Sequence, residues 1–403
     1  MSGGLLSSLV RRNASKIVFL VLDGAGGLPY PGRDGTALEV ARIPNLDALA
    51  RESVTGLLDP VGPGITPGSG PGHLSLFGYD PVRWQVGRGV LAALGVGIDL
   101  QAGDVAVRIN FATFNSDGTI ADRRAGRIDD ATNRRLVDLL RQRVNLGGEC
   151  RCELQTVKEH RAVMVLRGDD LGGRVTDTDP QAVGAVPIPA SGADSASSRT
   201  AELANELAAQ AREILSAERQ ANGVLMRGFA SFSPFPSVAD RYGLSALAVA
   251  RYPDYRGVAK LVGMTVLYDR FANLAEQVQA VRQRWNDYDF FFVHEKAADA
   301  RGEDGDFDGK VKVLEDVDAL VPEVRGLGAD VLVVTSDHST PALMKAHSFH
   351  PVPIMLNASV AFVDDVHAFS ERACGHGGLG RMPMQGIMRL ALAHAGRLAK
   401  FGA

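Results

Sequence analysis

Three short runs of apolar residues predict strands that are buried on both faces. They cover residues 16–22, 289–294 and 330–336. Continuous apolar positions are typical of a parallel sheet, because helices cover both of its faces. The first run leads into Asp23-Gly24 and the third into Asp337-His338. The carboxyl ends of parallel strands meet at one sheet edge, where ligands bind in α/β folds, so these polar residues are predicted to lie together.

Helical periodicity alternates with these strands near both ends of the chain. It covers residues 36–53, with a break at Pro44, and residues 272–285, and another helix is expected from about Lys310. This alternation of strands and helices favours an α/β core with a mostly parallel sheet flanked by helices.

The middle of the chain has a different pattern. From about Trp84 the strands are short and alternating, as at 105–109 and 162–166. Helices are expected near 132–143 and 200–219, and the small residues at 191–198 are predicted to form a surface loop. We therefore predict a core domain made of residues 1–83 and 256–403, interrupted by a smaller α+β domain at 84–255.

Composition narrows the class of protein. A chain of 403 residues is long enough for two domains. A net charge of −4 argues against a nucleic-acid partner. The apolar residues 5–10 precede Arg11-Arg12, the reverse of a signal peptide, and no segment reaches membrane-spanning length. We interpret the three cysteines as reduced thiols. We therefore expect a soluble cytoplasmic protein without a membrane partner, and the sequence leaves open whether it forms a homo-oligomer.

A set of carboxylates and imidazoles points to a metal centre. Asp23, Asp337 and His338 follow buried strands, and Asp299 and Glu303 follow the strand at 289–294; His347 comes nine residues after His338. Mixed oxygen and nitrogen ligands suit two divalent cations, which can clamp a phosphoryl group during in-line transfer. Taken singly, each residue has an ordinary explanation, such as a turn, a helix cap or a structural histidine.

Ser69 is a candidate nucleophile. It lies in the glycine-rich segment 62–73, predicted to be a loop before a short helix that begins at Leu74. Backbone amides in such a loop can face an anion. A serine hydroxyl needs activation, which a nearby cation can supply.

These motifs resemble the archaeal-type, 2,3-bisphosphoglycerate-independent phosphoglycerate mutases of the alkaline phosphatase superfamily. The resemblance rests on Asp23-Gly24, the segment 69–73, Asp299 with a ligand four residues later, the segment 335–341, and His347 with 351–353. It extends over most of the chain through segments 87–91, 109–113, 121–127, 257–264 and 377–381.

The resemblance implies an alkaline-phosphatase-like core and an isomerase of glycolysis and gluconeogenesis that interconverts 2-phosphoglycerate and 3-phosphoglycerate through a phosphoserine. Such an enzyme would need no 2,3-bisphosphoglycerate as cofactor. Two divalent cations are implied, Mn²⁺ first, with Mg²⁺, Co²⁺ and Zn²⁺ as alternatives. The inserted domain would close over them and exclude water.

The resemblance also assigns roles to residues. Asp23, Ser69, Asp337 and His338 would hold one cation, with Ser69 phosphorylated. Asp299, Glu303 and His347 would hold the other, although the family has histidine where this chain has Glu303. The phosphoglycerate would be bound by Arg123, Arg127, Arg256 and Lys260, because guanidinium groups bond oxyanions in pairs.

Other functions remain open on the same residues. If water accepted the phosphoryl group, the protein would be a phosphatase or phosphonate hydrolase. If a nucleotide donated the phosphoryl group to a small alcohol, it would be a homoserine-kinase-like phosphotransferase. A rival of another class is an inactive metal-binding protein. Residues 304–315 match the calcium-loop pattern D-x-D-x-D-G-x₅-E. Because a strand rather than a helix is expected before them, we interpret them as an acidic loop that caps the helix beginning near Gly309.

Overall fold

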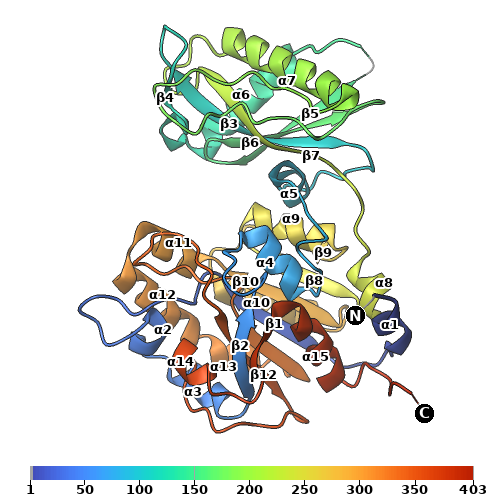
Figure 1. Cartoon of the computed structure of the whole chain (residues 1–403), viewed down its shortest axis with the longest axis vertical. Coiled ribbons are helices and arrows are strands. Elements are labelled where there is room, and N and C mark those ends of the chain that lie inside the picture. The colour runs from blue at the N-terminus through green and yellow to red at the C-terminus, as the bar shows by residue number, and fades with distance from the viewer. Residues whose placement is uncertain (1–2, 149, 403) are drawn as a thin grey trace. The chain divides into compact units, whose positions relative to one another are not determined.

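The computed structural model of the protein describes residues 3–148 and 150–402 (Figure 1). It divides into two compact units: a core unit of residues 1–85 and 235–403, and an inserted unit of residues 86–234. The predicted α/β class is confirmed. Within the described ranges no helix combines the length and apolar character needed to cross a membrane.

The core unit is built on an eight-stranded sheet. Its order is β13-β2-β12-β11-β1-β10-β8-β9, and β12 runs antiparallel to both of its neighbours while the other pairs are parallel. The strands in this order are Gly380–Pro383, Val54–Asp59, Val352–Ala358, Val331–Thr335, Ile17–Leu22, Phe290–Glu295, Ala246–Ala250 and Thr265–Val266. The three predicted apolar strands are β1, β10 and β11, which lie side by side at the centre of the sheet.

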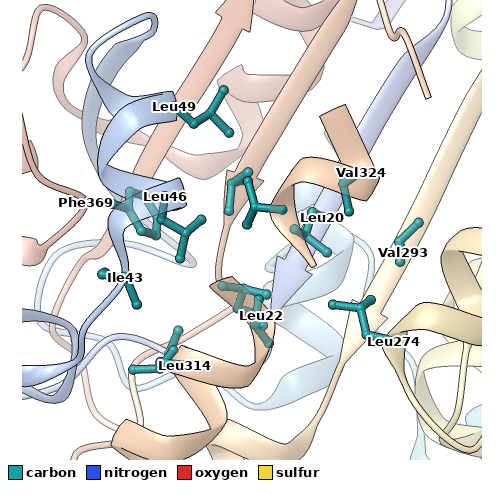
Figure 2. Packing of buried hydrophobic residues seen from close by; sticks show 14 of the residues in the cluster. Leu20, Leu22, Ile43, Leu46, Leu49, Leu274, Val293, Leu314, Val324 and Phe369 are labelled. Carbon is teal, nitrogen blue, oxygen red and sulfur yellow. The ribbon is translucent and has the colours of Figure 1, made fainter. Parts of the chain in front are cut away.

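Helices cover the sheet and explain its continuous apolar strands. Val18, Leu20 and Leu22 of β1 belong to one apolar cluster, while Ile17 and Phe19 are buried on the opposite face. Figure 2 shows Leu20 and Leu22 among side chains from the helices that form this cluster. Those helices include α2 Ala37–Val40, α3 Pro44–Ala50, α10 Leu274–Gln283, α12 Phe307–Asp318, α13 Val321–Arg325 and α14 Glu371–Cys374.

The remaining helices of the core unit include two that matter for the candidate site. These are α4, Ser69–Leu76, and α11, Ala297–Asp304. The break predicted at Pro44 falls between α2 and α3. The others are α1 Gly3–Leu9, α8 Val238–Tyr242, α9 Pro253–Leu261, α15 Ile387–His394 and the 3₁₀ turn η2 Met384–Gly386.

The inserted unit carries an antiparallel sheet of five strands. Four follow the order β4-β3-β6-β5, and β7 pairs with β3 outside this order. The strands are β3 Val105–Phe114, β4 Ile120–Asp122, β5 Arg151–Lys158, β6 Arg161–Arg167 and β7 Gly223–Ser231. The helices are α5 Arg88–Gly95, η1 Ala125–Arg127, α6 Asp130–Arg143 and α7 Ser195–Ile214.

The structure differs from the sequence prediction at two places around this unit. Helix α7 begins at Ser195, inside the stretch predicted to be a loop, because Asp194 caps it by accepting a hydrogen bond from Ser197 N. The core unit resumes at Phe235 rather than 256, because the fully buried strand β8 pairs in parallel with β10.

Helix α3 is capped by a carboxylate from a distant part of the chain. Its own N-cap residue, Ile43, supplies no side-chain cap. Asp318, at the end of α12 and 3% exposed, accepts hydrogen bonds from Leu46 N at 2.7 Å and Asn45 Nδ2 at 2.9 Å. The bond from Leu46 N, with a longer one from Asn45 N at 3.3 Å, satisfies main-chain amides that a helix start leaves without partners. Together these bonds join α3 to α12.

We predict that Asp318→Ala lowers the free energy of unfolding by about 2 kcal/mol, because buried donors lose a charged acceptor. Urea unfolding measures the change. Asp316→Ala on the same helix is the control, since Asp316 is exposed and bonded to Lys312; it should change stability by less than about 0.5 kcal/mol. Equal effects of the two substitutions would contradict this role of Asp318.

Candidate metal centre

The central strands deliver candidate ligands to one edge of the core sheet. Asp23 directly follows β1, and Asp337 and His338 follow β11 after one intervening residue. Asp299 lies in the first turn of α11, which follows β10. Because β1 pairs in parallel with both β10 and β11, these side chains emerge at the same end, and all four are fully buried.

The first group of candidate ligands comprises Asp23, Asp337 and His338. His338 Nε2 lies 3.1 Å from Asp337 Oδ2 and 3.4 Å from Asp23 Oδ1. One ligand atom from each residue lies within 4.8 Å of the others. Ser69 Oγ is 3.4 Å from the same His338 nitrogen. The predicted nucleophile therefore contacts the first group.

The second group comprises Asp299, His338 and His347. His347 Nε2 lies 3.5 Å from Asp299 Oδ1, and the two imidazole rings stack with centroids 3.6 Å apart. Glu303 lies one helical turn beyond Asp299 on α11, with Oε1 3.8 Å from His347 Nε2 and its side chain 53% exposed. Glu303 thus stands at the outer side of this group.

Hydrogen bonds leave one lone pair of each histidine directed at the carboxylates. His338 Nδ1 contacts Thr340 Oγ1 at 3.0 Å, and that hydroxyl donates to Asp299 Oδ1 at 2.6 Å, so Nδ1 carries the proton. His347 Nδ1 donates to Pro67 O at 3.0 Å. In both rings Nε2 is left as an acceptor, the form in which imidazole binds a metal.

The buried charges fit a cation. Both carboxylate oxygens of Asp23 and Oδ2 of Asp337 are buried without a hydrogen-bond partner. Burial, with Asp23 and Asp299 nearby, raises the pKa of Asp337 well above its usual range. Burial lowers the pKa of His338 to about 3, so its ring is neutral. Lys296 bonds to Asp299 and lies 3.5 Å from Asp23 Oδ2. Buried carboxylates in this arrangement need positive charge, which divalent cations would supply.

A layer of aromatic and imidazole rings lies behind the first group. His294 Nε2 is 3.2 Å from Asp23 Oδ2, and His73 Nδ1 is 3.3 Å from Asp337 Oδ2 and 2.8 Å from Ser69 O. Tyr255 stacks on His294 at 3.9 Å. These rings restrict how the two carboxylates can turn. Sequence reasoning gave no role to Tyr255, Thr340 and Lys296. Each has a partner in a distant segment, such as Asp299 for Thr340 and Asp23 for Lys296.

Ser69 is the first residue of α4 rather than part of a loop before it. The helix begins five residues before the predicted Leu74, because Gly68 is an extended N-cap and Pro71 is tolerated in a first turn. Gly72 permits a close approach: a Cβ there would lie 2.5 Å from Asp337 O. This packing places the start of α4, with its partial positive charge, beside the first group.

Gly24 is required by the turn that follows β1. Its φ is +63°, and a Cβ there would lie 2.7 Å from Asp299 Cβ. Its N–H donates to Asp337 Oδ1 at 3.3 Å. The Asp23-Gly24 pair therefore serves both as a turn and as a connection between candidate ligands.

The residues predicted to bind substrate occupy different environments. Arg256, 9% exposed, donates to Ala250 O at 2.7 Å and Asp269 O at 2.6 Å. Arg123 forms a bidentate pair with Asp179. Arg127 is exposed and has φ +56°, a strained conformation for a side chain of this kind. Lys260 lies on α9, so the core unit contributes Lys260 and Arg256 while the other two belong to the inserted unit.

One face of the inserted sheet gathers arginines that sequence reasoning missed. Arg108 is opposite Arg227 on β7, and Asn110 is opposite Arg161 on β6. Residues two apart in a strand share a face of the sheet, and so do residues directly opposite each other in neighbouring strands. These four side chains therefore lie on one face. The odd-numbered residues of β3 lie on the other face and pack against α6 and α7. Polar residues at alternate positions of an apolar strand were the available signal.

His160 lies beside these arginines and is buried. Burial first, then Arg161, Arg124, Arg127 and Arg108, lower its pKa to about 4. Such a concentration of positive charge around a neutral histidine is suited to an anionic ligand.

The calcium-loop pattern does not form an open loop. A helix, α11, does precede it, contrary to the expectation of a strand alone, but Asp304 ends that helix and Asp306 caps α12 by accepting from Gly309 N at 2.9 Å. The second half of the pattern is therefore helical. Asp308 is bonded to Arg33.

Comparison with known proteins identifies the family. A family model for the 2,3-bisphosphoglycerate-independent phosphoglycerate mutase matches residues 50–221. A probable 2,3-bisphosphoglycerate-independent phosphoglycerate mutase of Thermus thermophilus is 49% identical over 401 residues, covering 99% of both chains. A protein of the same description from Thermotoga petrophila is 47% identical over 398 residues, covering 99% of this chain and 98% of the relative. The chain belongs to this family.

Two solved structures have folds similar to that of this phosphoglycerate mutase. A Pyrococcus horikoshii protein matches with a TM-score of 0.82 and 29% identity, covering 97% of this chain and all of that one. The cofactor-independent phosphoglycerate mutase of Thermoplasma acidophilum matches with a TM-score of 0.69 and 30% identity, covering 94% and 100%. The resemblance inferred from the motifs and the enzyme class, an isomerase, are confirmed.

We predict that His160 makes the fold of this phosphoglycerate mutase sensitive to acid. The unfolded chain has a histidine pKa of about 6.5, whereas the folded value is about 4, so the unfolded state binds more protons between these values. The free energy of unfolding should therefore fall as pH drops from about 6.5 to about 4, by an amount of the order of 2 kcal/mol from this group.

Urea unfolding of wild type and His160→Gln in EDTA across this pH range isolates the contribution. The difference in unfolding free energy between the two proteins should change with pH in the stated window and be constant above it. A difference that is independent of pH would contradict the prediction.

Proposed function

We propose that the protein interconverts 2-phosphoglycerate and 3-phosphoglycerate through a phosphoserine on Ser69. The supporting observation is the contact of Ser69 Oγ with His338, at the point where two groups of potential metal ligands meet. The family name of the relatives, which cover almost the whole chain, supports the same substrates.

We assign the ligands as two sets. Asp23, Ser69, Asp337 and His338 would hold one divalent cation, and Asp299, Glu303 and His347 the other. Such cations would neutralise charge on the phosphoryl oxygens and favour ionisation of a nearby hydroxyl. The oxygen-rich set favours Mn²⁺ or Mg²⁺, with Co²⁺ and Zn²⁺ as alternatives.

Ser69 would act as the acceptor and then the donor of the phosphoryl group. Its Oγ loses its proton and forms a bond to phosphorus while the bond from phosphorus to the glycerate oxygen breaks, and that oxygen gains a proton. The other hydroxyl of the glycerate then loses a proton as it attacks the phosphoserine. The bond from phosphorus to Ser69 Oγ breaks, and Oγ regains a proton. The start of α4 favours negative charge at this position.

Arginine side chains would hold the phosphoglycerate while it turns. Arg127 is exposed, and Arg123, Arg256 and Lys260 complete the proposed set. Arg256 uses two of its donor groups on main-chain carbonyls, so we assign it a weaker part in binding. The arginine-bearing face of the inserted sheet has, by itself, the positive charge suited to an anion that carries both phosphate and carboxylate.

We predict that Ser69→Ala abolishes mutase activity while the fold is preserved. Loss of the nucleophile should reduce kcat by roughly 10⁴-fold or more. A coupled assay with Mn²⁺ measures isomerisation, and phosphate release and nucleotide-dependent phosphorylation of homoserine are measured in parallel on the wild type.

Ser75→Ala is the control for that substitution. Ser75 lies on the same helix, and its buried Oγ has no hydrogen-bond partner, so its removal should leave activity intact. Substantial turnover by Ser69→Ala would exclude the phosphoserine. Phosphate release as fast as isomerisation would favour a hydrolase, homoserine phosphorylation a kinase, and no turnover at all an inactive binding protein.

A second prediction concerns Glu303 as a ligand. Glu303→Ala should weaken binding of one Mn²⁺ by roughly tenfold or more, whereas Glu303→His should retain or raise both binding and activity with Mn²⁺. Titration of metal-free protein with Mn²⁺ measures the affinity. If neither substitution altered the metal dependence, Glu303 would not be a ligand.

A further inference from the structure

Lys310 is a buried cation whose three N–H groups all bind main-chain carbonyls. It lies on α12 and is 1% exposed. Its Nζ donates to Gly24 O at 2.7 Å, Gly26 O at 3.0 Å and Thr340 O at 2.9 Å. An ammonium group has three donors, so this arrangement satisfies it completely.

The three carbonyls belong to the two loops that carry most of the candidate ligands. Gly24 directly follows Asp23, and Thr340 lies two residues after His338. The loops also bond to each other, because Thr340 N donates to Gly26 O at 3.0 Å. Lys310 therefore joins the loop after β1 to the loop after β11 at a single point.

Thr340 connects this point to both groups of ligands. Its hydroxyl bonds to Asp299 Oδ1, and it accepts from His338 Nδ1. The position of its main chain, which Lys310 holds, therefore determines where the hydroxyl stands. A shift of Thr340 would move the hydrogen bond that orients His338 and the one that orients Asp299.

Glu371 fixes the other side of the first loop. It accepts from Gly27 N at 2.7 Å and from Thr36 Oγ1 at 2.7 Å. The turn at residues 24–27 is thus bonded through its carbonyls to a lysine and through an amide to a glutamate. Both partners lie outside the set of proposed ligands.

We propose that Lys310 is a positioning residue for the metal centre. It keeps the two loops in register, so that the ligands of both cations hold their spacing. The inference rests on the proposed function for the presence of two cations. It assigns Lys310 no contact with substrate and no step of the reaction.

The direction in which metal affinity changes when Lys310 is replaced distinguishes a positioning role from a purely electrostatic one. A buried ammonium near a metal centre repels cations, so charge alone predicts that its removal strengthens metal binding. Positioning predicts the opposite. Loss of groups that orient metal ligands typically weakens binding by roughly 10- to 100-fold, and we expect Lys310→Met to do so at both sites.

The experiment is a calorimetric titration of metal-free, full-length protein with Mn²⁺. Wild type should bind two ions, and Lys310→Met should bind both roughly 10- to 100-fold more weakly. Lys310→Gln, which keeps an amide donor, should fall between them. Lys312→Met is the matched control: it removes the same charge from the same helix, but Lys312 is exposed and paired with Asp316, so its affinities should equal those of wild type.

Unfolding of each variant in EDTA checks the fold. Unchanged or tighter Mn²⁺ binding by folded Lys310→Met would overturn the positioning role while leaving the proposed function intact. Failure of wild type to bind Mn²⁺ would overturn the proposed function and the inference together. If Lys310→Met and Lys310→Gln both failed to fold, the role would also be overturned, because the lysine would then support the whole core unit.

Discussion

Repulsion among buried carboxylates is the constraint on which the rest of this structure depends. Asp23, Asp299 and Asp337 are fully buried around the imidazole of His338. Lys296 offsets part of this charge, and several carboxylate oxygens have no hydrogen bond. Such a cluster is costly unless cations share it. The turns, rings and lysines around it hold these candidate metal ligands together.

Much of this could be predicted from the sequence because the signal was local. An apolar run buried on both faces implies a parallel strand, and the residue after such a strand lies at the ligand-binding edge of the sheet. That reasoning placed Asp23 and Asp337 together although more than 300 residues separate them. The glycine-rich segment likewise drew attention to Ser69.

What could not be predicted depends on contacts between distant segments. Thr340, Tyr255 and Lys310 look like ordinary residues in the sequence, and their importance appears when their partners are known. The same holds for the end of the insertion, which is decided by the pairing of β8 with β10. The close approach of Gly72 on α4 to Asp337 O is likewise a contact that no periodicity reveals.

The two units carry different kinds of functional group. The core unit concentrates carboxylates and imidazoles, and the inserted unit presents arginines on one face of an antiparallel sheet. Cations and a nucleophile are needed where the phosphoryl group moves, whereas guanidinium groups are suited to hold the anionic substrate.

The most direct measurement of the central claim is anomalous X-ray scattering from crystals grown with Mn²⁺. We predict two peaks at the edge of the core sheet, one among Asp23, Asp337, His338 and Ser69, the other among Asp299, Glu303 and His347. Peaks at other places, or their absence at a saturating Mn²⁺ concentration, would contradict the account.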